Sequence, residues 1–137
     1  MAEIRYLSAD DVVILQAEAV RRSGAAASPL IRPDTLESAL ARPRNAAGYE
    51  GADLIRQATL LAVGVSQAQA FLDGNKRAAF AAADVFLRVN GHAFAGDPME
   101  IARRLEQVAE AVGGTDRDEA TDRLEAWLRD HVGPVDG

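Results

Sequence analysis

Apolar residues recur every three or four positions along most of the chain, a spacing typical of amphipathic helices. Stretches with glycine, proline and polar residues separate these segments and predict the loops. No clear strand pattern interrupts them, so the spacing predicts an all-α fold of about six helices. The expected helices cover residues 9–22, 34–42, 52–71, 75–90 and 98–112, and a last one runs from 115 to a loose tail at Gly133.

Several short signals define the expected helix ends. Residues 8–11 form an acidic capping box, and residues 115–118 form a second one that starts the last helix. Pro43 is expected to end the second helix, and Gly91 is the residue expected just after the fourth. Trp127 is the expected core anchor of the last helix.

The two central helices, 52–71 and 75–90, are apolar around most of their circumference. Such helices are usually buried, so the polar stretch that joins them is expected at one end of the core. The segment 42–51 contains a proline, two glycines and an asparagine, and is too short and polar for a core element. It is either an irregular loop or a small hairpin around Tyr49.

Composition narrows the classes of protein. The 137 residues fit a single domain, 1–137, and 48% of them are hydrophobic although only 5% are aromatic, which favours closely packed helices. The net charge of −6 argues against a nucleic-acid binder. There is no cysteine, no signal-peptide pattern and no apolar run long enough for a membrane, so we expect a cytoplasmic protein without membrane contact.

The stretch from Asp73 to Arg77 carries the candidate chemistry. Asp73 or Asn75 is a natural N-cap, so Asn75, Lys76 and Arg77 lie around the first turn of a helix. Free backbone N–H groups and two cations there favour an anion such as phosphate. Asp73 fits this picture when Mg²⁺ bridges its carboxylate to the phosphates. The simpler interpretation is a turn, a helix cap and two solvated cations.

Residues 71–80, FLDGNKRAAF, resemble the signature of the Fic/Doc superfamily, His-x-Phe-x-Asp-Gly-Asn-Lys-Arg-Thr-Ala. Lys76 is typical of the Doc (death-on-curing) branch, because Fic adenylyltransferases usually have glycine there. Residues 4–11, 36–43 and 86–91 also look like the corresponding Doc segments, so the resemblance covers essentially the whole chain.

The resemblance implies a compact helical domain in which residues 42–51 form a small β-hairpin flap that aligns a target segment. Doc toxins transfer the γ-phosphate of ATP to a threonine of elongation factor Tu and so stop translation. A Phd-type antitoxin folds a C-terminal segment onto the toxin and blocks it. The implied partners are therefore ATP, this antitoxin and the elongation factor.

The resemblance also implies roles for single residues. Asp73 would hold Mg²⁺, and Gly74 would let the loop backbone approach the phosphates. Asn75, Lys76 and Arg77 would bind and orient the phosphates, which are the main tasks in phosphoryl transfer. Phe71 would pack into the core and fix the loop.

One position departs from the signature in its chemistry. Gln69 occupies the place of the histidine that acts as general base on the target hydroxyl, and glutamine has no titratable nitrogen. A milder change puts Ala78 in place of the usual threonine, and the only histidines, His92 and His131, lie outside the motif. We therefore predict an impaired Doc-type toxin, whether the glutamine is natural or introduced. A nucleotide-binding pseudoenzyme and a Fic-type protein nucleotidyltransferase are the alternatives.

Overall fold

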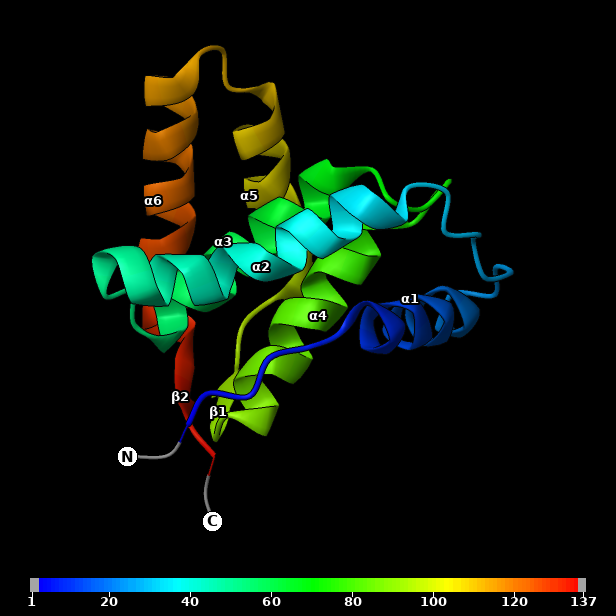
Figure 1. The fold of residues 1–137 in the computed structure, drawn as a ribbon, viewed down its shortest axis with the longest axis horizontal. Coiled ribbons are helices and arrows are strands. Elements are labelled where there is room, and N and C mark those ends of the chain that lie inside the picture. The colour runs from blue at the N-terminus through cyan, green and yellow to red at the C-terminus, as the bar shows by residue number, and fades with distance from the viewer. Residues whose placement is uncertain (1–2, 136–137) are drawn as a thin grey trace.

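The computed structural model describes residues 3–135, which form six helices and one small antiparallel sheet (Figure 1). This confirms the all-α fold class. The helices are α1 (Ala9–Arg22), α2 (Pro33–Glu50), α3 (Leu54–Ala68), α4 (Asn75–Val89), α5 (Pro98–Glu110) and α6 (Gly114–His131), and the strands are β1 (His92–Phe94) and β2 (Val132–Pro134).

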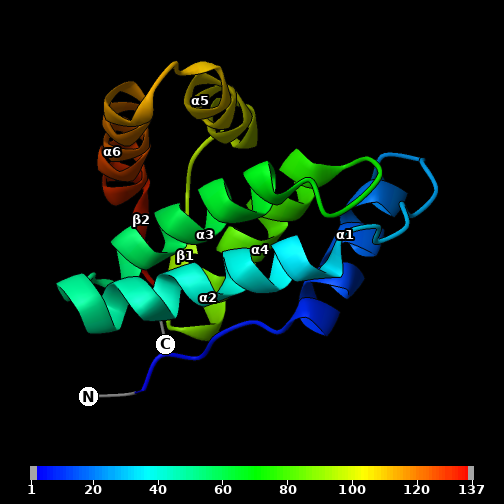
Figure 2. The ribbon, with the colours of Figure 1, turned by 45° about the horizontal axis from the view of Figure 1, so that its top comes forward.

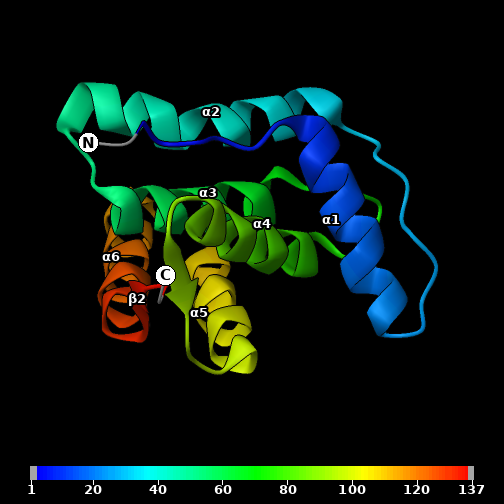
Figure 3. The same cartoon turned by 90° about the horizontal axis from the view of Figure 1, so that it is seen from below.

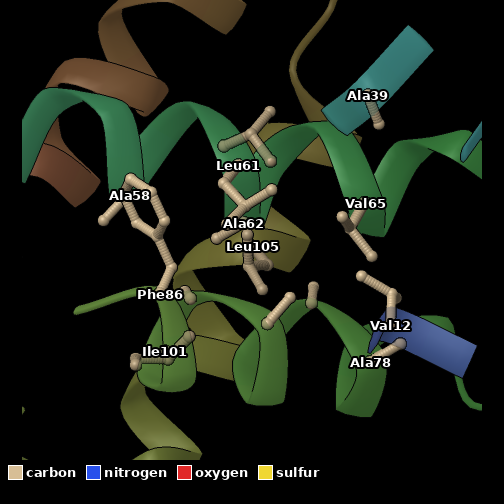
Figure 4. Close-up of a cluster of buried hydrophobic side chains, with 14 of the residues drawn as sticks. Val12, Ala39, Ala58, Leu61, Ala62, Val65, Ala78, Phe86, Ile101 and Leu105 are labelled. Carbon is tan, nitrogen blue, oxygen red and sulfur yellow. The ribbon is translucent and has the colours of Figure 1, made fainter. Parts of the chain in front are cut away.

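Helices α3 and α4 form the centre of the molecule. Seen from below, α2 lies along one side of this pair, the α5–α6 hairpin lies on the opposite side, and α1 crosses one end (Figure 3). Fully buried alanines on the two central helices, such as Ala58, Ala62 and Ala78, allow close packing, and Phe86 and Leu61 fill the larger spaces (Figure 4). The predicted burial of these two helices is confirmed.

Helix α1 has the predicted bounds because its capping box forms. Asp11 N donates to Ser8 Oγ at 3.1 Å, and Ser8 N donates to Asp11 Oδ2 at 2.9 Å. The last helix differs from the prediction, since α6 begins at Gly114 and its N-cap, Gly113, provides no side-chain bond. The tail prediction is also wrong for residues 133–135, because β2 pairs with β1 and Val135 N donates to Gly91 O; residues 136–137 lie outside the described range.

Both alternatives predicted for residues 42–51, the irregular loop and the small hairpin flap, are wrong, because most of this segment is helical. Helix α2 continues through Pro43 to Glu50 and ends at Gly51, whose φ of 67° is left-handed. Pro43 removes one backbone donor, but its ring is buried in the face that packs on α3. Gly64 of α3 allows this packing, since a Cβ there would lie only 3.3 Å from Ala39 Cβ. Burial against α3 therefore outweighs the local helix-breaking signal.

Candidate functional site

The loop between α3 and α4 joins the two buried helices at one end of the core, as predicted. It starts at Gln69, the C-cap of α3, and ends at Gly74, the N-cap of α4. Both residues have left-handed backbone conformations, with φ of 50° and 76°. For glutamine this conformation is uncommon, because its Cβ approaches the backbone closely. The two residues together turn the chain from one helix into the next.

A segment before α2 holds this loop along its length (Figure 2). Ile31 N donates to Ala70 O at 2.7 Å, and Leu72 N donates to Pro29 O at 3.1 Å. Asp73 N completes the contact by donating to Ser28 Oγ at 2.8 Å. Several backbone polar groups of the loop are thus paired, two of them through a short antiparallel bridge that the sequence did not predict.

Two residues of the motif lock the loop from inside. Phe71 is 1% exposed and packs into the core, as predicted. The Asn75 side chain bonds the Phe71 backbone twice, accepting from its N–H at 3.1 Å and donating to its carbonyl at 3.0 Å. The amide of Asn75 therefore fixes the shape of the loop.

A buried glutamine on α1 supports the same loop, and the sequence prediction missed it. Gln16 is 1% exposed, and its Nε2 donates to Asp73 O at 3.3 Å. A Cβ on Gly74 would lie 2.9 Å from this nitrogen, so a larger residue would have to displace the Gln16 amide, and the left-handed φ of 76° also favours glycine. The available signal was a polar residue midway between Val12 and Val20 on the buried stripe of α1.

The first turn of α4 has two cationic side chains, and no side chain caps its backbone N–H groups. Its N-cap is a glycine without a capping side chain, so this end of the helix dipole lacks a side-chain acceptor. Lys76 and Arg77 extend from this turn and are exposed. Lys76 Nζ pairs with Glu106 on α5, and Arg77 Nη1 donates to Ser23 Oγ at 2.9 Å. Asp73 is exposed beside this turn, and its Oδ1 accepts from Gly74 N at 2.8 Å.

Gln69 lies at the other end of the loop. Its side chain is exposed, and its Nε2 donates to Ser66 O at 3.3 Å at the end of α3. Its backbone carbonyl accepts from Arg32 Nη1 at 2.7 Å. The two histidines belong to other elements: His131 stacks on Trp127 at the end of α6, and His92 lies in β1.

A groove of about 590 Å³ runs between α1, α4 and α5 beside the start of α4. Lys76 and Arg77 line it, and Glu18 and Asp84 supply negative charge. The other lining residues are mostly apolar, including Leu15, Ala19, Phe80, Val85 and Met99. Lys76 and Arg77 therefore lie next to the loop and also line one end of a largely apolar groove.

Within residues 3–135, no three His, Cys, Asp or Glu side chains come together in a way that would hold a metal ion. None of the helices in this range is long and apolar enough to cross a membrane.

Comparison with known families gives one match. The model of the Fic/DOC family matches residues 6–87, from just before α1 to near the end of α4. The match includes every residue of the loop and both cations. A comparison with curated proteins finds no match to the chain.

Proposed function

The chain belongs to the Fic/DOC family, and we propose that it is a Doc-type toxin of a toxin–antitoxin system with impaired catalysis. The family activity in this proposal is transfer of the ATP γ-phosphate to a threonine of elongation factor Tu, which blocks translation in the cytoplasm. One observation carries the proposal: a loop at the end of the core that keeps the family's phosphate-binding residue types but has Gln69 at the general-base position.

The start of α4 supports phosphate binding. Arg77 and Lys76 are exposed cations beside a helix N-terminus without a side-chain cap. Gly74 has no Cβ, so a phosphate can come close to the backbone there. The Asn75 side chain is occupied by Phe71, so we assign Asn75 to the site through its position and its support of the loop. Lys76 favours the Doc branch over Fic-type nucleotidyl transfer.

Asp73 fits the metal that the family implies. Mg²⁺ is usually held by one or two carboxylates together with phosphate oxygens and water, and Asp73 provides one exposed carboxylate next to the proposed phosphates. When bound, Mg²⁺ would supply charge neutralisation of the phosphates. Ser28 and Gln16 bond the backbone N–H and the backbone carbonyl of Asp73, and so hold the residue that carries this carboxylate.

The missing function is proton removal. A threonine hydroxyl must lose its proton as it attacks phosphorus, and general-base catalysis typically contributes about 10²–10⁴-fold. The Gln69 amide is not basic, so in this proposal substrate binding persists while transfer falls by about this factor.

The groove supports the antitoxin partner. It is largely apolar and starts at the same two cations, so a segment seated in it would also cover the start of α4. We propose that the C-terminal segment of a Phd-type antitoxin binds there and shields the nucleotide site.

Reversion of the glutamine tests the proposal. The chain, Gln69→His and a matched control, Gln67→His, would each be incubated with γ-labelled ATP, Mg²⁺ and elongation factor Tu. Gln67 is exposed two residues earlier, so the control adds the same imidazole outside the motif position. We expect label on the target to rise about 10²-fold or more with Gln69→His alone.

The other outcomes discriminate the alternatives. ATP binding by all three proteins without labelled target would indicate a pseudoenzyme or another target. A mass increase of the target by a nucleotide, measured by mass spectrometry, would indicate Fic-type transfer. Absence of ATP binding would refute the proposed site.

A further inference from the structure

Lys76 is paired with a carboxylate from a part of the chain that the family match does not cover. Its Nζ donates to Glu106 Oε1 on α5, whereas the match ends at residue 87. Both side chains are close to half exposed, at 45% for Lys76 and 54% for Glu106. The pair therefore joins the candidate site to a C-terminal helix without being enclosed by the core.

The neighbouring cation is held differently. Arg77 donates to the neutral hydroxyl of Ser23, and among the described residues no carboxylate lies within 4 Å of its guanidinium. Of the two cations in the first turn of α4, only Lys76 thus has its charge compensated by the chain itself. An anion that contacts Lys76 has to displace Glu106 or tolerate a carboxylate beside it.

Helix α5 presents this carboxylate from a fixed position. Ile101, Leu105 and Val108 are at most 3% exposed and attach the helix to the core. The Glu106 side chain itself is exposed, so it can leave Lys76 without any change in packing. The hydrogen bond from Lys76, and then its charge, lower the pKa of Glu106, so the carboxylate stays ionised at neutral pH.

We propose that Glu106 is a built-in competitor for the anion site: it positions Lys76 when the site is empty and weakens the binding of polyphosphate until it is displaced. The proposal rests on the phosphate-binding role assigned to the start of α4 and adds a regulatory residue to it. Glu106 would be a positioning residue, since it acts through Lys76.

The expected effect is modest because the pair is exposed. Exposed ion pairs contribute little in water, which corresponds to about twofold to fivefold in an equilibrium constant. Screening by salt reduces the effect further, so low ionic strength gives the clearest measurement.

Calorimetric titration with Mg²⁺–ATP, and with inorganic tripolyphosphate as a probe without a base, tests the proposal. We expect Glu106→Gln to bind both about twofold to fivefold more tightly than the unchanged chain. Glu110→Gln is the matched control, because Glu110 is an exposed carboxylate one turn along α5. It should leave both affinities unchanged, and Glu106→Asp should shift affinity less than Glu106→Gln. Unchanged unfolding midpoints would verify that all variants are folded.

A double-mutant cycle separates the pair from a general charge effect. In a Lys76→Gln background, Glu106→Gln should no longer raise affinity, because its partner is absent. Equal gains from Glu106→Gln and Glu110→Gln, or a gain that persists without Lys76, would overturn the proposal. Equal affinities of Glu106→Gln and the unchanged chain would overturn it while leaving the proposed function intact. Failure of every protein to bind either probe would overturn both.

Discussion

The two ends of α3 are held by different kinds of interaction. At its N-terminal end, Asp53 caps the helix by accepting from Arg56 N at 2.9 Å, and Arg129 of α6 bonds both Asp53 oxygens at 2.8 and 3.3 Å. Arg56 adds a bond to Glu125 at 3.0 Å. At the C-terminal end, a buried phenylalanine, neutral backbone bonds and the Asn75 amide hold the loop.

The charged side chains at one end of α3 stabilise the fold, whereas those at the other end remain available to bind a ligand. At the first end, arginines and carboxylates of α2, α3 and α6 pair with one another, since Arg56 also reaches Glu50 at 3.4 Å.

At the second end, apolar packing and mostly neutral hydrogen bonds stabilise the loop, and two further bonds involve the Arg32 guanidinium and the Asp73 carboxylate. Asp73 and Arg77 are exposed, and among the described residues neither forms an ion pair. Charges that are not paired within the fold can bind a charged ligand without first being released, whereas Lys76 has to give up Glu106.

The largest expected effect is from Phe71→Ala. The ring is 1% exposed and is the main apolar anchor of the loop, so its removal should lower the free energy of unfolding by about 3–5 kcal/mol. Urea denaturation followed by circular dichroism would measure the change. Phe71→Leu, which keeps most of the volume, should cost about 1.5 kcal/mol or less. A loss below about 1 kcal/mol for the alanine variant would mean that the loop is held mainly by its hydrogen bonds.

The sequence predicted the elements whose signals are local. The prediction of α1 was correct because its capping box and its apolar stripe agree. The helix start near Asp73–Arg77 was also predicted correctly, but its expected N-cap, Asp73 or Asn75, was wrong, because the N-cap is Gly74 and no side chain caps the helix. The family match supports the coarse assignment, whereas the roles of the individual residues stay predictions.

The features that the sequence did not predict depend on contacts distant along the chain. The β1–β2 pairing joins residues about forty positions apart through three-residue strands, which are too short for a visible alternation. Helix α2 passes Pro43 because its burial against α3, where Ala39 lies close to Gly64, outweighs the local helix-breaking signal. The bridge from Leu30 to Phe71 is set by the packing of both loops and has no composition signature.

A smaller effect is expected from Gly74→Ala, with Gly51→Ala as its control. Both glycines have left-handed backbones, so alanine should cost each about 1 kcal/mol in strain. At Gly74 the new Cβ would also lie 2.9 Å from Gln16 Nε2 and 3.2 Å from Val20 Cγ2, whereas at Gly51 nothing lies within 4 Å. The buried crowding should add about 1–2 kcal/mol at Gly74 alone.

Thermal and urea unfolding of both variants would measure this difference. If backbone strain alone caused the loss, the two variants would lose the same stability, and the contact with Gln16 would have no part in it. In a Gln16→Ala background, which is itself less stable, Gly74→Ala should cost less than in the unchanged chain, because the nitrogen that the new Cβ meets is absent.

The smallest expected effect is from Arg129→Met at the charged end. The pKa of Asp53 is lowered, first by the hydrogen bond from Arg129, so the ionised carboxylate is favoured in the folded chain. A lowered pKa stabilises the fold fully above the ordinary aspartate value of about 3.9, and this contribution is lost as the pH falls through the lowered folded value. Because both side chains are about half exposed, the variant should lose only about 0.5–1 kcal/mol at pH 7.

The difference between the unchanged chain and Arg129→Met should therefore shrink below about pH 4, and also in about 1 M NaCl at pH 7. Arg123→Met is the control, since Arg123 is exposed on the same helix and, among the described residues, forms no ion pair. Phe71→Leu, at the other end of α3, should show no such dependence on salt, because it changes only apolar packing. Equal salt dependence at the two ends would remove the distinction between an end held by charge and an end held by packing, and with it the argument that Asp73 and Arg77 are available to a ligand because the fold does not use their charges.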